Sequence, residues 1–158
     1  MNISQQISKH FKEVHYGGNW TAVNLKDVLS DVNFIEADTK IGTFNTIATL
    51  VFHLNYYISI IIPVLKGEPL IGSDELSFKN SLLNSELEWQ NRIPPLFKEV
   101  DECAALIEMV SETNYNQPFT DEKYGNYLRN LLGVIEHTHY HLGQIVMIKK
   151  IIRSGIVA

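Results

Sequence analysis

Three of the six histidines in the chain lie within five residues of one another, in the stretch VIEHTHYHLGQI at positions 134–145. On a helix, residues four apart are separated by about 40° around the axis and about 6 Å along it. His137 and His141 would therefore share one face, while His139 would point about 160° away from either ring and lie exposed. Two imidazoles at this spacing can bind one metal ion, as the paired histidines of zinc-protease helices do.

A third ligand is needed to complete such a site, and His53 is the best candidate. It lies in the most hydrophobic segment of the chain, LVFHLNYY, whereas His10 and His15 have no strongly apolar surroundings in the sequence. A buried histidine costs free energy unless its ring nitrogens are bonded, and a shared metal ion would satisfy His53, His137 and His141 together. The alternative stays open at this point, because interior histidines are commonly hydrogen-bonded core residues and an i,i+4 pair can arise by chance.

Four further residues could line a pocket around these rings or hold them in place. Asn45 lies two turns before His53 on the same predicted helix face, and Tyr57 lies one turn after it. Gln144 follows His141 by three residues and could brace its ring. Trp89 could contribute an aromatic wall, although aromatic residues at helical spacing more often pack in the core.

Apolar residues recur at helical spacing in several segments, and these segments must position the histidines. The predicted helices cover residues 3–14, 24–32, 44–65, 95–110 and 121–153, with caps at Asn24, Thr43 and Ser85. Pro63 should close the third of these helices. The pair Pro94-Pro95 should break or kink the chain after Ser85, because proline removes a helical hydrogen bond.

No segment shows the alternation of apolar and polar residues that is typical of a half-buried strand. Four principal helices and one long connection over residues 66–84 predict an all-α fold, a four-helix bundle with one long crossover connection. At 158 residues the chain has the length of one domain, and we find no linker within residues 1–158.

The composition excludes several classes of function. A net charge of −5 and a pI near 5.6 argue against nucleic-acid binding, which depends on clustered Lys and Arg. The single cysteine, Cys103, excludes an internal disulfide and the multi-cysteine zinc sites, and its neighbours predict a buried, unreactive thiol. We see no signal peptide at the N-terminus, so a cytoplasmic location is expected.

Residues 41–65 carry no charge and could be mistaken for a membrane span. The segment holds His53 and Asn55 near its middle, and both polar groups would need partners in lipid. We therefore expect the central helix of a soluble core and no membrane partner.

Taken together, these motifs resemble the DinB/YfiT-like family over nearly the whole chain. HTHYHLGQI is similar to the H-x-x-x-H-x-G-Q helix that ends the bundle in that family, LVFHLNYY to its second-helix histidine, and ELEWQNR to its tryptophan-bearing approach to helix three. The resemblance implies a DinB-like bundle with a divalent metal ion, often nickel or zinc, bound by His53, His137 and His141. It also implies a homodimer. The doubled proline Pro94-Pro95 departs from the family pattern.

Two classes of function follow from these expectations. Some members of the family are metal-dependent transferases or isomerases that act with a low-molecular-weight thiol, so a small thiol or an electrophilic small molecule is the expected partner. A metal ion with open coordination positions could instead activate a water for hydrolysis. The chain could equally be a non-catalytic module, which binds a metal or a small molecule or serves as a dimeric scaffold, and the sequence does not separate these alternatives.

Overall fold

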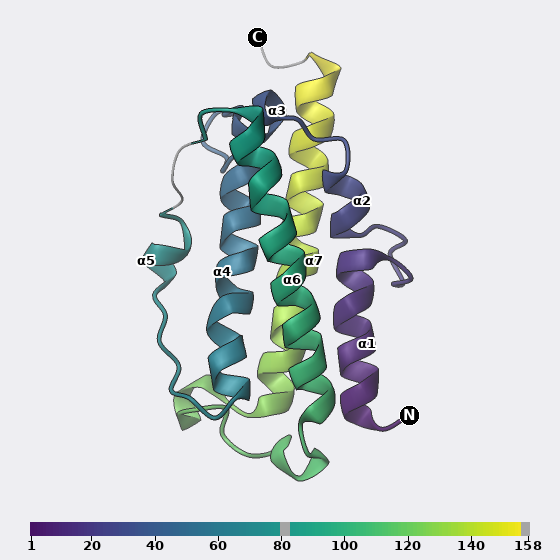
Figure 1. The fold of residues 1–158 in the computed structure, drawn as a ribbon, viewed down its shortest axis with the longest axis vertical. Helices are drawn as coiled ribbons and strands as arrows, with labels where there is room; N and C mark the ends of the chain where they lie inside the picture. Colours follow the sequence, from purple (N-terminus) through teal and green to yellow (C-terminus); the bar gives the residue numbers. More distant parts are fainter. Residues whose placement is uncertain (80–82, 156–158) are drawn as a thin grey trace.

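The computed structural model describes residues 1–79 and 83–155, and these form an all-helical bundle. Its helices are α1 (Ile3–Tyr16), α2 (Leu25–Leu29), α3 (Phe34–Asp38), α4 (Ile47–Leu65), α5 (Asp74–Ser77), α6 (Glu86–Met109) and α7 (Tyr127–Ser154), with short 3₁₀ turns at Glu112–Asn114 and Glu122–Tyr124. The long helices α1, α4, α6 and α7 lie side by side (Figure 1). The described ranges contain no strand, which confirms the prediction of a helical bundle.

Side-chain caps fix where the helices begin. Asn24 and Ser85 cap α2 and α6 as predicted, each accepting a hydrogen bond from a backbone N–H of the first turn. The prediction was wrong for α4, which begins at Ile47 with Thr46 as its cap rather than with Thr43. It was also wrong for the last helix, because α7 is capped by Asn126.

The late start of α7 has a local cause. Asp121 caps only the 3₁₀ turn at Glu122–Tyr124, and Gly125 then takes a φ of +77°, which a continuing right-handed helix does not allow. The backbone N–H groups of Tyr127 and Leu128 bond to carbonyls of the preceding loop. The chain therefore turns back at Gly125 before α7 begins.

The prolines interrupt the helices less than predicted. α6 runs without a break from Glu86 to Met109 and contains both Pro94 and Pro95. Both rings are exposed, as are Gln90 and Asn91, whose carbonyls lose their helical partners. Water can satisfy these carbonyls on the outer face, which explains why the helix tolerates the pair. In α4 the helix likewise continues past Pro63 to Leu65.

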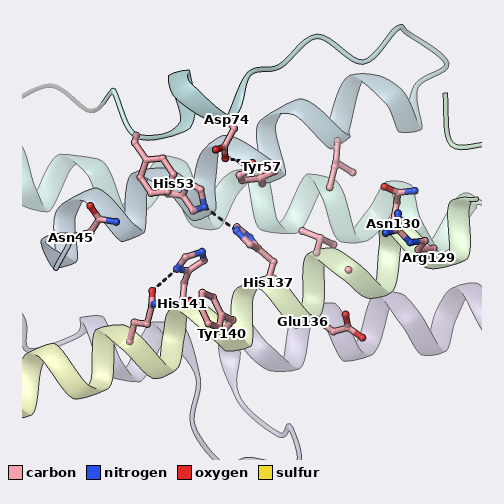
Figure 2. A pocket seen from close by; sticks show the side chains of 15 residues that line it. Asn45, His53, Tyr57, Asp74, Arg129, Asn130, Glu136, His137, Tyr140 and His141 are labelled. Carbon is pink, nitrogen blue, oxygen red and sulfur yellow. Dashed lines mark hydrogen bonds between the residues drawn. The ribbon is translucent and has the colours of Figure 1, made fainter. Parts of the chain in front are cut away.

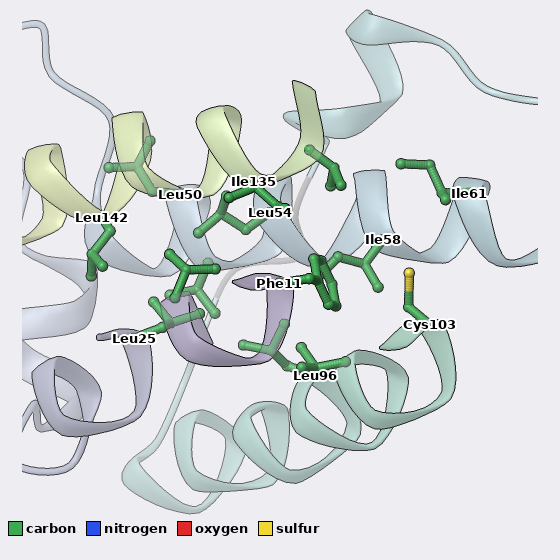
Figure 3. Close-up of a cluster of buried hydrophobic side chains, with 14 of the residues drawn as sticks. Phe11, Leu25, Leu50, Leu54, Ile58, Ile61, Leu96, Cys103, Ile135 and Leu142 are labelled. Carbon is green, nitrogen blue, oxygen red and sulfur yellow. The ribbon is translucent and has the colours of Figure 1, made fainter. Parts of the chain in front are cut away.

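The core lies between the four long helices (Figure 3). Phe11 of α1, Leu54 and Ile58 of α4, and Leu96 of α6 are almost completely buried. Trp89 is also fully buried, and its indole N–H donates to the Val32 carbonyl at 2.7 Å. Of the two alternatives that the sequence left open for Trp89, the structure therefore shows the core, and Trp89 does not line the pocket of the histidines.

Two sequence features have the structural surroundings that were expected. α4 is long and apolar enough to cross a membrane by length and composition alone, and 56% of its most apolar window is buried inside the bundle. That burial is typical of the central helix of a soluble core. Cys103 is fully buried, and burial, followed by the charges of Glu102 and Glu99, raises the pKa of its thiol to about 12. The thiol is therefore unreactive at neutral pH.

Basic residues near the C-terminal end of α7 pair with acids of the α2–α3 region. Arg153 bonds to Asp31 at 2.7 Å and to Glu36 at 2.6 Å, and Lys149 also bonds to Asp31. Hydrogen bonds from Lys149 and Arg153 lower the pKa of Asp31 to about 2. These cations are thus neutralised within the fold rather than presented as a basic face.

Candidate metal centre

Three histidines from two helices meet in the bundle. His53 comes from α4, while His137 and His141 come from successive turns of α7. One nitrogen from each ring can be chosen so that all three lie within 4.8 Å of one another (Figure 2). The structure thus brings together the three residues that were predicted as metal ligands.

His139 lies outside this cluster, as the helical spacing predicts. Its ring faces α1, with its centroid 6.2 Å from that of His10. The side chain is half-buried rather than exposed, because α1 packs against this side of α7. It is therefore a suitable comparison residue for the three clustered histidines.

The distance between two of the rings fits a shared ion. The Nε2 atoms of His53 and His137 are 3.0 Å apart. Two imidazole nitrogens each about 2.0–2.1 Å from one ion would be about 2.9 Å apart at a right angle and about 3.4 Å apart at a tetrahedral angle. The observed separation lies within that interval, so these two nitrogens need little movement to bind one ion.

Hydrogen bonds at the far side of two rings place the proton on Nδ1 and leave Nε2 unprotonated, the form that can bind a metal ion. In the metal-free protein Nε2 of His53 is hydrogen-bonded to Nε2 of His137. The Ser77 hydroxyl donates to the Asp74 carbonyl at 2.6 Å, so its oxygen accepts from Nδ1–H of His53 at 2.8 Å. Nδ1–H of His141 donates to Oε1 of Gln144 at 2.7 Å, the bracing contact that the sequence suggested. Such partners fix the tautomer and orientation of a metal-binding histidine.

Burial keeps the three rings neutral. It is the largest cause that lowers the pKa of His137 to about 4, and the neighbouring His141 and His53 add to the effect. Burial, then His141, also lowers the pKa of His53, and burial lowers that of His141. Neutral imidazole is the form that binds a metal ion, so the cluster is in the binding state at neutral pH.

The cluster opens into a pocket of about 730 Å³. The histidines lie between Asn45 at one end and Arg129 and Asn130 at the other (Figure 2). Tyr57 lines the pocket as predicted, with its ring centroid 4.7 Å from that of His137. Asn45 also lines it, but it is exposed and precedes α4 rather than lying on it. The volume is in the ordinary range for a small-molecule site.

Sequence reasoning missed the residues that the crossover connection brings to the site. Besides Ser77, they are Asp74, whose carboxylate accepts from the Tyr57 hydroxyl at 2.9 Å, and Phe78, whose ring stacks on His53 at 4.0 Å. Apolar residues do not recur at a regular spacing in the connection, so the sequence did not predict that it packs against α4. The only signal was the stretch GSDELS, in which Ser73 precedes two acids, as at the start of a helix.

The role of Ser77 gives a testable prediction. Ser77→Ala removes the acceptor for Nδ1–H of His53 and leaves a buried donor without a partner. We expect the affinity for a divalent ion to fall about 10–100-fold, the usual cost of losing such a partner. Competitive titration against a chelator measures this loss, and Ser59→Ala, a serine of α4 whose hydroxyl bonds to the Tyr56 carbonyl and which lies outside the pocket lining, is the control. Equal affinities of the two variants would contradict the role assigned to Ser77.

The fold and the site define a class: a helical bundle with a candidate tri-histidine metal centre in an open pocket. Comparison of the chain with protein-family models, with curated proteins and with solved structures gives no match. The functional argument therefore depends on the geometry of the site.

Proposed function

We propose that the protein binds a divalent metal ion through His53, His137 and His141, with nickel or zinc as the expected ion, and that it is a DinB-like protein. The observation that supports this most strongly is the convergence of three neutral imidazoles in the wall of an open pocket. The hydrogen bonds at Nδ1 of His53 and His141 add to it. Imidazole ligands suit both ions, so the side chains do not select between them.

The proposed activity is transfer of a low-molecular-weight thiol to an electrophile. Three protein ligands leave coordination positions for a further ligand, which is typical of catalytic rather than structural sites. A divalent ion in the site lowers the pKa of a thiol or water that it binds. Thiol transfer needs no separate general base once the thiol has lost its proton, so the residues present are sufficient for it.

The reaction can be tested with small thiols and an aryl chloride that carries nitro groups. A carbon–sulfur bond forms, the carbon–chlorine bond breaks, chloride leaves and the thiol proton passes to solvent. We expect turnover of cysteine, glutathione or coenzyme A by protein loaded with nickel or zinc, and none above background for His137→Ala. Absence of turnover across the panel, with metal bound, would overturn the transferase proposal and favour a non-catalytic binding module.

A metal-dependent hydrolase is the second candidate, and one contact favours it. The Asp74 carboxylate bonds to the Tyr57 hydroxyl in the pocket wall, and the charge of Asp74 raises the pKa of His53 and His137 against the larger effect of burial. A carboxylate so placed could accept a proton from an attacking water. Hydrolysis of an activated ester that is lost in Asp74→Asn, with metal content unchanged, would favour the hydrolase over the transferase.

Two expectations stay predictions. A homodimer is implied by the family resemblance, and sedimentation of the purified protein tests it. A cytoplasmic location is expected from the sequence, and fractionation of cells tests it.

A further inference from the structure

A second pocket, of about 350 Å³, lies next to the histidine pocket. Its apolar lining comes from Phe44 before α4, Leu50 of α4, and Met147, Ile148 and Ile151 of α7. No charged side chain of the described residues lines it. We call these five residues and the space between them the apolar pocket.

The apolar pocket has a buried floor and an open mouth. Leu50 and Ile148 are almost fully buried, whereas Phe44 and Met147 are 56% and 57% exposed. Large apolar side chains that remain in water beside a concave surface gain free energy when a ligand covers them. An enclosed apolar cavity of about 150 Å³ is enough for benzene, so the apolar pocket has room for an aryl group or a short alkyl chain.

The apolar pocket adjoins the histidine pocket, and their shared lining bears on what could occupy it. Asn45 and Gln144 line both pockets. Gln144 also accepts a hydrogen bond from His141, so a residue in the wall of the apolar pocket directly contacts a predicted metal ligand. A molecule whose reacting end lies at the histidines can therefore extend past Gln144 into apolar surroundings.

We propose that the apolar pocket binds the alkyl or aryl group of the substrate, whose reacting atom lies at the three histidines. This rests on the proposed function and deepens it: the substrate class is a small molecule with an apolar group and with a thiol or a thiol-reactive end. The site then has two parts, one for chemistry and one that selects substrates by apolar volume.

Binding of the apolar group can be measured without metal. The probe is N-phenyl-1-naphthylamine, a neutral aromatic compound whose fluorescence rises in apolar surroundings. We expect saturable binding to the full-length protein, weakened at least tenfold by Met147→Gln. Met109→Gln is the control, because Met109 is also an exposed methionine, at 81% against 57% for Met147, and it lies on α6 and lines neither pocket. Equal binding by both variants would overturn the proposal.

The link to the histidines is tested with metal-loaded protein and straight-chain alkanethiols of two to six carbons. We expect each added methylene to tighten binding about three- to fourfold in the unchanged protein, as transfer of a methylene out of water predicts. This increment should shrink in Met147→Gln. Thiol binding that is independent of chain length would overturn the inference and leave the proposed function standing.

Two further outcomes are distinguishable. Failure of the protein to bind any divalent ion would overturn the proposed function, and with it the link to the histidines, whatever the naphthylamine probe shows. A shift from dimer to monomer in Met147→Gln, measured by sedimentation, would overturn the proposal in favour of a second copy of the chain as the occupant.

Discussion

His53→Ala, His137→Ala and His141→Ala are each expected to lose stoichiometric metal, while His139→Ala keeps it. The first three substitutions remove one of the three imidazoles whose nitrogens lie within 4.8 Å of one another. Loss of a ligand itself should exceed the roughly 10–100-fold cost of losing an outer partner, so we expect affinity to fall at least about 100-fold. Elemental analysis of protein purified without an affinity tag measures this directly, because no added histidines compete for the ion.

His139→Ala is the matched control for this experiment. It removes the same side chain from the same helix, between the two predicted ligands, but its ring faces His10 of α1. Circular dichroism should show unchanged helicity in all four variants. If metal content falls as much in His139→Ala as in His141→Ala, the three-histidine site is refuted.

The pairing of His137 with His141 could be predicted because it depends only on the pitch of one helix. His53 could be predicted from its apolar surroundings in the sequence, since a polar ring in such a segment needs a partner. The sequences around His53 and around His137 do not determine how close α4 and α7 lie. It follows from packing of the whole bundle, which brings Nε2 of His53 to 3.0 Å from Nε2 of His137.

The sequence did not determine whether a given aromatic side chain lines the pocket or packs in the core. Tyr57 and Trp89 both lie at helical spacing, and the sequence left open for each whether it lines the pocket or packs in the core. Tyr57 lies there, with its hydroxyl bonded to Asp74. Trp89 instead packs in the core. Its indole N–H donates a hydrogen bond to the carbonyl of Val32, which lies in the turn between α2 and α3. That partner is 57 residues away in sequence, and no local pattern identifies it.

Helix ends and the crossover connection were hard to predict for related reasons. The loop offers both Asp121 and Asn126 as possible helix caps, and the positive φ of Gly125 between them delays the start of α7 to Tyr127. The connection reaches the site because Ser73 donates its backbone N–H to the Tyr56 hydroxyl at 2.7 Å. A Cβ at Gly72 would lie 2.9 Å from Cδ1 of Ile60, so the connection packs closely against α4 at this point. These are tertiary contacts, and they place Asp74 and Ser77 at the histidines.

The second large effect expected is loss of metal on acidification. Protons compete with the ion for the three rings, so affinity falls as pH drops through the pKa values of the metal-free histidines. An unperturbed histidine would begin this loss near pH 6.5. Burial, followed by the neighbouring rings, lowers the pKa of His137 to about 4, and burial also lowers those of His53 and His141. We therefore expect the metal ion to dissociate between about pH 6.5 and 4. Histidines with an unperturbed pKa would release it at higher pH.

The helices should outlast the metal during this acidification. His15 is fully buried and its pKa is lowered to about 4, chiefly by burial. Its folded-state pKa is below the unfolded value, so stability is complete above pH 6.5 and is lost as pH falls toward 4. At pH 5 this costs about 2 kcal/mol, and the lowered pKa values of His53, His137 and His141 add to the cost once the metal has left, against the roughly 5–15 kcal/mol of a typical domain. Circular dichroism beside a metal assay at pH 5 should therefore show helicity retained while metal is released. Loss of both together would make the ion structural, and full metal retention down to pH 3 would contradict binding by the three histidines.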